Sequence, residues 1–192
     1  RPASVVRRVV MVKISRELLG KVLFTRTGKN ITAGIITETE AYAGITDRAS
    51  HAYNNRRTDR TEIMYSQGGT AYVYLCYGIH HLFNVVTNKK EIPHAILIRA
   101  LFPVEGIETM RKRRGKSISD QKLCSGPGSL SVAMGITVNN TGIDLLGNQI
   151  WIEDQGIKVD QKKIEITPRI GIDYAGEDAK LPYRFIFTSP VL

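Results

Sequence analysis

Short β-prone runs that follow one another in pairs are the feature that most constrains the fold of this chain. Lys21 to Thr25 is followed by a turn at Gly28-Lys29-Asn30 and by a run from Ile31 to Tyr42, which predicts a hairpin with a long second arm. Tyr72 to Tyr77 is followed by a return strand through Phe83 to Thr87. Strands joined by short turns pair antiparallel, so the sheet is predicted to be largely antiparallel.

Further strands and a few helices complete the pattern. The segment Ser15-Arg16-Glu17-Leu18-Leu19-Gly20 predicts a short helix that its glycine ends. The other expected elements are a buried strand at 95–101, a helix that opens at Pro103 and runs through Met110, a short helix within 123–134, and late strands at Trp151, 164–167 and 184–187. Repeats, low-complexity tracts and a convincing linker are absent from the sequence. We therefore expect one domain, residues 1–192, with a mixed, largely antiparallel α+β fold.

The chain carries a marked excess of positive charge. It has 27 Lys and Arg against 18 Asp and Glu, a formal net charge of +9. The basic residues gather in separate clusters, namely Arg7-Arg8, Arg56-Arg57 with Arg60, Lys89-Lys90, and Arg111 to Arg114 with Lys116. Several such clusters in one small domain suit a phosphate backbone that crosses the surface, which favours nucleic acid as the partner. The alternative is a basic surface without such a role.

The aromatic run Tyr72-Val73-Tyr74-Leu75-Cys76-Tyr77-Gly78 ends at a turn residue. Side chains alternate along a strand, so Tyr72 and Tyr74 point one way while Val73 and Leu75 point the other. Tyr77 comes at the bend, where its ring would project from the tip. A large aromatic there, on a cationic surface, indicates a wedge for a base stack. The alternative is that these tyrosines only pack in the sheet, because strands favour tyrosine.

Two carboxylates and a phenol follow one another with period two near the end of the 31–42 run. This spacing places Glu38, Glu40 and Tyr42 on one strand face. Such a cluster suits a general base beside an aromatic platform. The alternative is a solvated face with salt-bridged glutamates. His51 lies within reach of the same site, in a polar segment from Gly44 to Gly69 whose length favours a functional loop.

Other potential ligands do not form a recognisable metal or cofactor site. His80 and His81 are adjacent, so on a strand they point to opposite faces, and neither they nor His94 has a Cys or acid partner at ligand spacing. Ser125-Gly126-Pro127-Gly128 resembles a phosphate-binding loop, but it lacks the Lys-Ser/Thr ending. We therefore predict no metal and no cofactor.

Cysteine usage and hydropathy indicate the compartment. Cys76 and Cys124 have no paired spacing, so we expect neither a disulfide nor an iron–sulfur or zinc site, and a reducing setting fits. No apolar run approaches the length of a membrane span, and the start, Arg1-Pro2-Ala3-Ser4, does not resemble a signal peptide. We expect no membrane partner, and a start at Arg1 suggests that residues once preceded it.

Taken together, these segments resemble the alkyladenine (3-methyladenine) DNA glycosylase family, the monofunctional enzymes that excise alkylated and deaminated purines. The resemblance runs in family order over nearly the whole chain. The matching segments are Leu18-Leu19-Gly20-Lys21, Glu38-Thr39-Glu40-Ala41-Tyr42, His51, Gly69-Thr70-Ala71-Tyr72-Val73-Tyr74, Tyr77-Gly78, Asn84, Ile98-Arg99-Ala100-Leu101, Pro103, Glu105-Gly106, Met110-Arg111, Leu123-Cys124-Ser125-Gly126-Pro127, Arg169-Ile170-Gly171 and Ala175-Gly176.

The resemblance implies a fold and a reaction. The fold would be a single compact α+β domain with a mixed, largely antiparallel curved sheet, surrounding helices and a protruding β-hairpin that inserts into DNA. Glu40 would be the general base that activates a water for hydrolysis of the N-glycosidic bond. Arg99 and the main-chain carbonyl of Ile170 would help to hold that water. The lesions of this family include 3-methyladenine, 7-methylguanine, hypoxanthine and ethenoadenine.

The resemblance also implies how the damaged base is held. Tyr42, His51 and Tyr74 would line the pocket, with the flipped purine stacked between Tyr42 and the other two rings. Asn84 would form a wall that clashes with the exocyclic amine of guanine. Tyr77 would enter the minor groove and fill the gap left by the extruded nucleotide.

Several further expectations accompany the resemblance. The protein would be a monomer without a cofactor. Its partner would be double-stranded DNA with a damaged purine, contacted from the minor groove side. The protein would be cytoplasmic and nucleoid-associated in a bacterium, or nuclear in a eukaryote. The Glu40 strand face carries no lysine for a Schiff base, so cleavage of the DNA strand is not expected. Ser129 stands where a lysine is common, and Asp173-Tyr174 replaces a more usual Gly-His pair.

Two readings from other classes remain open. One is a non-catalytic DNA-binding module of the same fold. The presence of Glu40 and Arg99 argues against this reading. The other is a formyltransferase-type or RNA-binding domain with a related sheet topology, which would need neither this pocket nor a wedge at Tyr77.

Overall fold

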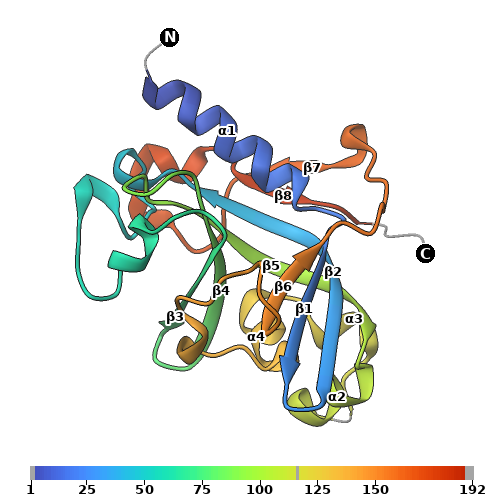
Figure 1. Ribbon diagram of the computed structural model, residues 1–192. Helices are drawn as coiled ribbons and strands as arrows, with labels where there is room; N and C mark the ends of the chain where they lie inside the picture. Colours follow the sequence, from blue (N-terminus) through green and yellow to red (C-terminus); the bar gives the residue numbers. More distant parts are fainter. Residues whose placement is uncertain (1–2, 116, 189–192) are drawn as a thin grey trace.

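One long strand, β2 (Asn30–Tyr42), organises the sheet of this protein. In the computed structural model, which describes residues 3–115 and 117–188 with the backbone alone for residues 3–7, β2 has partners along both edges (Figure 1). Its first half pairs with β1 (Val22–Thr27), and its last residues pair with β8 (Arg184–Ile186) on the same edge. Its other edge pairs along most of its length with β5 (His94–Glu105).

Every described strand pairing is antiparallel, and the sheet curls into a half-barrel. The strand order is β3-β4-β5-β2-β1-β6, with β8 pairing both β2 and β7. The remaining strands are β3 (Thr70–Cys76), β4 (His80–Thr87), β6 (Ile150–Glu153) and β7 (Glu165–Thr167). The predicted α+β domain with a largely antiparallel curved sheet is thereby confirmed.

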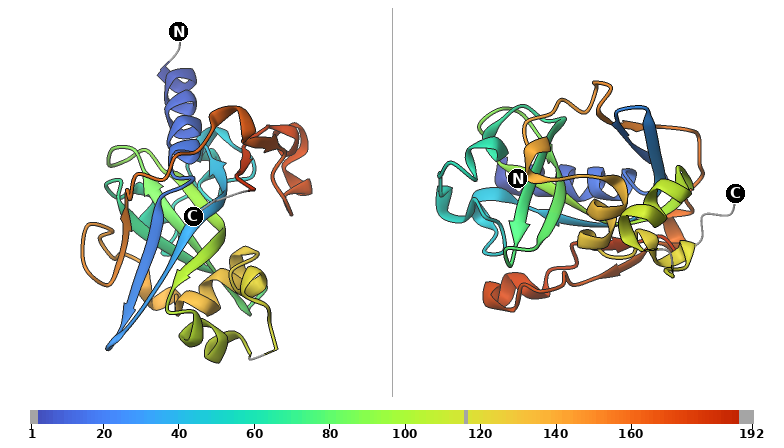
Figure 2. Two further views of the ribbon diagram at one scale, coloured as in Figure 1. Left: turned by 90° about the vertical axis from the view of Figure 1, so that its right-hand side faces the viewer. Right: turned by 90° about the horizontal axis from the view of Figure 1, so that it is seen from below.

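The α-helices gather at two opposite ends of the molecule (Figures 1 and 2). At one end α1 (Ala3–Glu17) packs on β2, and Ser15 and the buried Thr39 hydroxyl bond to each other across that contact at 2.9 Å. At the other end lie α2 (Ile107–Arg114), α3 (Asp120–Leu123) and α4 (Pro127–Met134). Short 3-10 helices occupy the connections: η1 (Gly44–Thr46), η2 (Tyr53–Asn55), η3 (Glu62–Tyr65), η4 (Val138–Asn140), η5 (Gln161–Lys163) and η6 (Asp173–Lys180).

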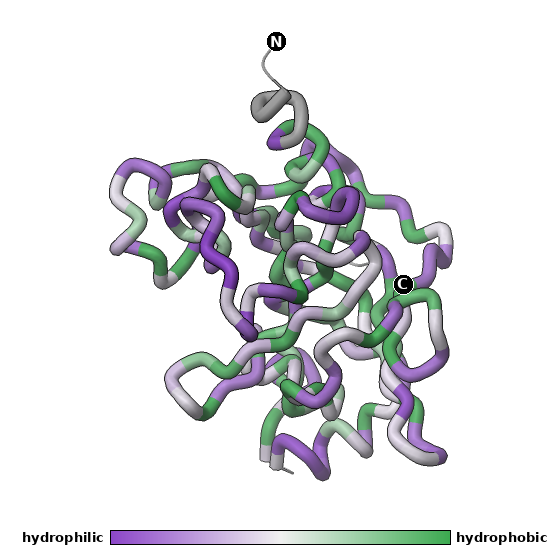
Figure 3. The backbone as a smooth tube through the Cα atoms, turned by 60° about the vertical axis from the view of Figure 1, so that its left-hand side comes forward, coloured by the Kyte–Doolittle hydropathy of each residue, from purple (hydrophilic) through white to green (hydrophobic). Residues whose placement is uncertain are grey.

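The main hydrophobic core lies between the curled sheet and these helices, and hydrophilic stretches run along the outer loops (Figure 3). Phe83, Ile98 and Phe185 from three strands are almost fully buried there, with Met11 of α1 and Leu130 of α4. Because this core fixes β2, β4, β5 and β8 together, side chains on their other face are held in a rigid frame. Within the described residues, no helix combines the length and apolar character that crossing a membrane requires.

The prediction of a helix that opens at Pro103 is wrong, because β5 continues to Glu105 and α2 begins only at Ile107. Proline near a helix start is a common signal, but it is also tolerated at bulges where a strand needs no amide donor. Pro103 lies at such a place, opposite Gly34, next to a register shift. Gly106 then takes a φ of 71°, which turns the chain into the helix.

The long polar segment 44–69 is ordered by its own contacts. Arg57 lies over the ring of Tyr65 at 4.1 Å and forms ion pairs with Glu62 and Glu91. The hydroxyl of Thr61 donates to the carbonyl of Arg56. These links tie the segment to the turn between β4 and β5, so one wall of the site described next has a defined shape.

Candidate active site

All eight side chains or main-chain positions that the sequence singled out line one pocket of about 330 Å³. They come from five parts of the chain that the curled sheet brings together: β2, the 44–69 segment, the β3–β4 hairpin, β5 and the 170–174 segment. The residues are Glu40, Tyr42, His51, Tyr74, Tyr77, Asn84, Arg99 and Ile170. The volume is at the small end of the range for ligand sites, which suits a group the size of a single base.

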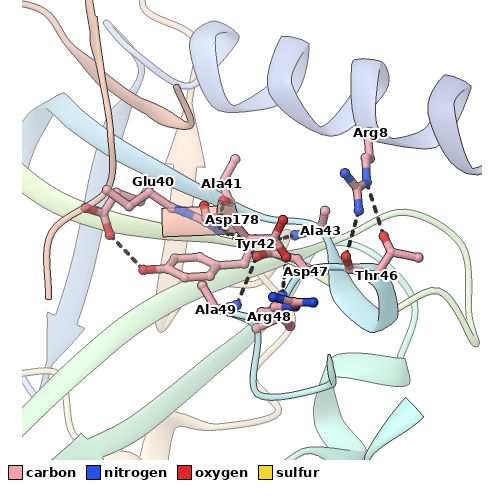
Figure 4. Close-up of polar contacts among 12 residues, drawn as sticks. Arg8, Glu40, Ala41, Tyr42, Ala43, Thr46, Asp47, Arg48, Ala49 and Asp178 are labelled. Carbon is pink, nitrogen blue, oxygen red and sulfur yellow. Dashed lines mark hydrogen bonds and ion pairs between the residues drawn. The ribbon is translucent and has the colours of Figure 1, made fainter. Parts of the chain in front are cut away.

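Glu40 is fully buried in the wall of this pocket, and donors surround its carboxylate. Its Oε1 accepts a hydrogen bond from the amide of Ile170 at 2.8 Å and lies 3.5 Å from an Nη of Arg99. Its Oε2 accepts a hydrogen bond from the hydroxyl of Tyr42 at 2.8 Å, as Figure 4 shows. Three donors from three different elements compensate the burial of the carboxylate and fix its orientation.

Arg99 is shared between two carboxylates. Its Nε donates to Glu38 at 2.8 Å, and the same Glu38 oxygen accepts from Arg184 at 2.6 Å. Burial alone would lower the pKa of Arg99, but the charges of Glu40 and Glu38 raise it. Glu38 itself is not part of the pocket lining, because β2 changes register on both sides of it. The predicted shared face therefore brings Glu40 and Tyr42 into the pocket, while Glu38 orients Arg99.

Tyr42 carries its proton throughout the neutral range. Burial, and after it the negative charge of Glu40, raise the pKa of Tyr42 well above its ordinary value. The phenol therefore stays a donor to Glu40, and its ring is held on one side by the guanidinium of Arg169 at 4.8 Å. One tyrosine thus serves both as a pocket wall and as a support for the carboxylate.

Three rings form the wall supplied by the hairpin and the 44–69 segment. His51 and Tyr74 meet edge to face, with centroids 4.6 Å apart and an angle of 78° between their planes. His51 Nδ1 lies 2.9 Å from the hydroxyl of Tyr72, and burial raises the pKa of Tyr72 to about 12. Because no other acceptor for this hydroxyl occurs among the described residues, we assign the phenol as the donor and place the imidazole proton on Nε2.

His51 is neutral at physiological pH. Burial, and then the positive charges of Arg60 and Arg56, lower its pKa from 6.5 to about 4. In the unfolded chain the same imidazole binds its proton at the ordinary pKa, so between these two values the unfolded state holds more protons.

The free energy of unfolding should therefore fall as the pH drops from 6.5 to about 4, by at most about 1.4 kcal/mol per pH unit. Urea unfolding of the wild type and of His51→Gln, compared across this interval, checks the expectation. The variant should lack this part of the acid dependence. Parallel curves for the two proteins would show that His51 is not buried as a neutral imidazole.

A buried ion pair lies behind the pocket wall. The side chains of Arg169 and Asp47 are both fully inaccessible to solvent. Two charged hydrogen bonds from the guanidinium to the carboxylate, of 2.6 and 2.9 Å, join them. Arg169 also donates to the carbonyls of Ala41 and Asp178, while Asp47 accepts from the amides of Ala43 and Ala49. The pair thus joins the end of β2, the loop before His51 and the segment that carries Ile170. Figure 4 shows Asp47 with Ala43, which directly follows Tyr42 in the chain and whose amide donates to Asp47.

The turn between β3 and β4 presents Tyr77. The amide of Ile79 donates to the carbonyl of Cys76 at 3.1 Å, and the two central residues, Tyr77 and Gly78, have φ values of 52° and 72°. Two positive φ values are typical of a type I′ hairpin turn. Glycine adopts them freely, but tyrosine at this position is strained. The ring is 88% exposed although it borders the pocket.

Asn84 lies on the pocket floor, in β4 opposite Tyr72. Its amide nitrogen donates to the carbonyls of Tyr72 and Leu82, at 3.3 and 3.2 Å. Both amide hydrogens are therefore used by the backbone, which fixes the side chain and leaves Oδ1 as the polar atom without a partner among the described residues.

Several members of the basic clusters form contacts within the fold. Arg8 of α1 reaches Thr46, as Figure 4 shows, and Arg111 pairs with Asp120 and Glu108. Arg113 and Arg114 donate to the main-chain carbonyls of Ala133 and Leu123. Their local excess of positive charge is thus partly consumed by contacts that a sequence pattern does not reveal.

Two members of the 56–60 cluster remain available for an anionic partner. Arg56 and Arg60 form no side-chain hydrogen bond or ion pair with another described residue, and both are close enough to His51 to lower its pKa. They therefore place positive charge next to the pocket. The side chain of Arg7 and all of Lys116 lie outside the described residues.

The three histidines that could suggest a metal are used elsewhere. The Nδ1 of His81 accepts the amide of Val138, the ring of His80 packs against Gly128, and His94 bonds with Asn88. Across residues 3–115 and 117–188, no group of three or more His, Cys, Asp or Glu side chains could hold a metal ion.

Sequence reasoning missed part of the site. Tyr174 lines the pocket mouth, and Asp47 and Arg169 stabilise its wall, yet none of the three was given a role. Asp47 carries one local signal, because an aspartate that accepts the amide two residues on forms an Asx-turn. The pairing of Asp47 with a residue 122 positions away leaves no local signal in the sequence.

Comparison with known proteins identifies relatives of this chain. The family model of methylpurine-DNA glycosylase matches residues 5–190. A protein of Alkaliphilus oremlandii (strain OhILAs) described as "Putative 3-methyladenine DNA glycosylase" is 47% identical over 182 residues, which cover 91% of this chain and 89% of the relative. A protein of Chlamydia felis (strain Fe/C-56) with the same description is 46% identical over 174 residues, 90% of this chain and 88% of the relative.

Proposed function

The chain belongs to the methylpurine-DNA glycosylase family, and we propose that it is a DNA repair enzyme that flips damaged purines out of duplex DNA and hydrolyses their N-glycosidic bond. The observation that carries this proposal is the carboxylate of Glu40, buried in a pocket of one-base size and held by Ile170, Arg99 and Tyr42. The product would be an abasic site. The substrates would belong to the class of 3-methyladenine, 7-methylguanine, hypoxanthine and ethenoadenine.

Glu40 would act as the general base. Departure of the base leaves positive oxocarbenium character on the sugar, which a nearby carboxylate stabilises. The same carboxylate can take a proton from the attacking water. Arg99 and the main-chain carbonyl of Ile170 would complete the site for this water. The fixed orientation of Glu40 supports this role, because a preorganised group needs little rearrangement in the transition state.

The flipped purine would lie between Tyr42 and the opposite wall of His51 and Tyr74. The angle of 78° between the His51 and Tyr74 rings refines this picture, because a flat base can lie parallel to only one of them. The other ring then meets the base with its edge. Alkylated purines carry positive charge, which strengthens their stacking on electron-rich rings. Asn84 would form the wall that rejects the exocyclic amine of guanine.

Tyr77 would enter the duplex from the minor groove and fill the gap in the stack. Its exposure and its strained φ support this role, since backbone strain is typically retained where function requires a particular residue. Base stacking on an aromatic ring contributes about 1–3 kcal/mol, which offsets part of the cost of extrusion.

Tyr77→Ala should therefore weaken capture of a lesion-bearing duplex and slow excision at subsaturating protein by about 5- to 100-fold. Alanine keeps the Cβ atom, so the backbone strain at this position is retained and the effect reports the ring. Single-turnover excision over a range of protein concentrations measures it. Leu75→Ala, which removes a 42% exposed residue from the same hairpin but outside the pocket lining, serves as control. Equal curves for wild type and Tyr77→Ala would exclude the wedge.

Base release tests the proposed function. Duplexes that carry one hypoxanthine, one ethenoadenine or one alkylated purine are incubated with excess protein, and abasic sites are revealed by alkali. Release from damaged but not from undamaged duplex is expected. Strand cleavage without alkali is not expected, because no lysine lies on the Glu40 strand face. Tight binding of all these lesions without release would instead favour a non-catalytic DNA-binding module of the same fold.

The protein would contact the DNA as a monomer, from the minor groove side. Arg56 and Arg60 next to the pocket support a phosphate backbone at that edge, because cations on phosphates supply much of the affinity of such complexes. Bacterial relatives fit a cytoplasmic, nucleoid-associated place of action for this enzyme.

A further inference from the structure

Two exposed tyrosines border the pocket, and they come from different parts of the chain. Tyr77 lies on the β3–β4 turn, and Tyr174 lies in η6, close after the residue whose amide holds Glu40. Tyr174 is 70% exposed and therefore buries little surface in the protein alone. An aromatic ring at the mouth of a pocket gains contact area only when a ligand enters.

The ring of Tyr174 is nevertheless held in place. Its hydroxyl donates to the carbonyl of Ala49 at 3.3 Å. Ala49 is buried, and the chain that follows it leads within two residues to His51. The ring thus joins the wall around Ile170 to the wall around His51 across the mouth. A side chain that is already ordered loses little conformational entropy when a ligand contacts it.

The position of Tyr174 determines which part of a nucleotide it would meet. If a base lies inside the pocket against Tyr42 and Tyr74, the groups at the mouth are the deoxyribose and its two phosphates. Tyr174 is neutral at physiological pH, since partial burial raises its pKa, and it adds no cation for a phosphate. The ring face is apolar and suits the carbon atoms of a sugar.

We propose that Tyr174 packs against the deoxyribose of the extruded nucleotide and retains this nucleotide in the pocket until the bond breaks. Tyr174 is then a positioning residue, and its contact acts from the protein side while Tyr77 blocks return from the duplex side. This inference rests on the proposed glycosylase function and adds a specific sugar contact to it.

A partition experiment tests the contact. Protein is first bound to a duplex with one lesion that the wild type excises, and an excess of unlabelled lesion duplex is then added. The labelled DNA either loses its base or dissociates. Tyr174→Ala should shift this partition toward dissociation by about 5- to 100-fold, the range for an aromatic contact to a nucleotide. Its excision rate at saturating protein should change much less, a split that a general loss of structure would not produce.

Two variants sharpen the result. Tyr174→Phe keeps the ring but loses the bond to Ala49 that orders it, so it should partition between Tyr174→Ala and the wild type and nearer to the wild type. Leu146→Ala removes a 90% exposed residue of a loop that lies beside the start of β3, at the end of this strand away from the hairpin turn. This variant should have no effect. If wild type excises the lesion and Tyr174→Ala partitions as wild type does, the sugar contact alone is refuted. If wild type releases no base from any lesion, the proposed function fails, and the sugar contact fails with it.

Discussion

Glu40→Gln should bind a lesion-bearing duplex about as tightly as the wild type. It should release the base about 10²- to 10⁴-fold more slowly, which is the usual contribution of a general base. Glutamine has the shape of glutamate, and its carbonyl can still accept the amide of Ile170 while its NH₂ group faces the hydroxyl of Tyr42. The pocket therefore survives. The variant loses the negative charge opposite the sugar and the ability to take a proton from water.

Single-turnover base release by wild type and Glu40→Gln, with binding measured in parallel, checks this expectation. Glu38→Gln is the matched control, because Glu38 lies on the same strand and pairs with the same Arg99 but outside the pocket lining. Its effect should be far smaller. Turnover by Glu40→Gln at the wild-type rate would refute the assigned role of this carboxylate.

Asp47→Ala should lower the free energy of unfolding by about 3–5 kcal/mol, the typical cost of leaving one member of a buried ion pair without its partner. The guanidinium of Arg169 would stay buried without a counter-ion, since its side chain is fully inaccessible in the fold. The amides of Ala43 and Ala49 would also lose their acceptor. Urea unfolding at neutral pH measures the change.

An exposed ion pair provides the comparison. Glu62→Ala removes a partner of Arg57, and because the Glu62 side chain is 59% exposed, the change should cost far less stability than Asp47→Ala. A double variant, Asp47→Ala with Arg169→Met, should lose less stability than the sum of its two single variants, because the second change removes the unpaired charge. A cost below about 1 kcal/mol for Asp47→Ala would contradict the burial of this pair.

Patterns that depend on neighbouring residues could be read from the sequence. Strand alternation predicts that Tyr72 and Tyr74 point away from Val73, and in the structure the two tyrosines line the pocket while Val73 lies in the main core. Tyr77 lies at the turn between two strands, also as predicted. These positions follow from local geometry, since side chains alternate along a strand and a glycine marks its end.

Contacts between distant parts of the chain could not be read in the same way. The β-bulges around Glu38 interrupt the alternation, and no residue type announces them. Pro103 is a residue typical of helix starts, yet it lies in a strand. The pairing of β5 with β2 stabilises the strand conformation more than the local preference of proline favours a helix. The three arginines of the 111–114 cluster looked free for phosphates in the sequence, but the fold supplies acceptors for each of them. The roles of the pocket residues stay predictions until activity is measured.

The clamp formed by Arg57 on Tyr65, Glu62 and Glu91 has a thermodynamic consequence for recognition. If the polar segment 44–69 were disordered in the free protein, it would become ordered only on contact with a partner, and the lost chain entropy would reduce the affinity. Here the segment is already folded when the protein is alone, and it holds His51 and the cations Arg56 and Arg60 in position. Its entropy is lost once, when the chain folds, and a duplex that binds next to it need not supply that free energy again.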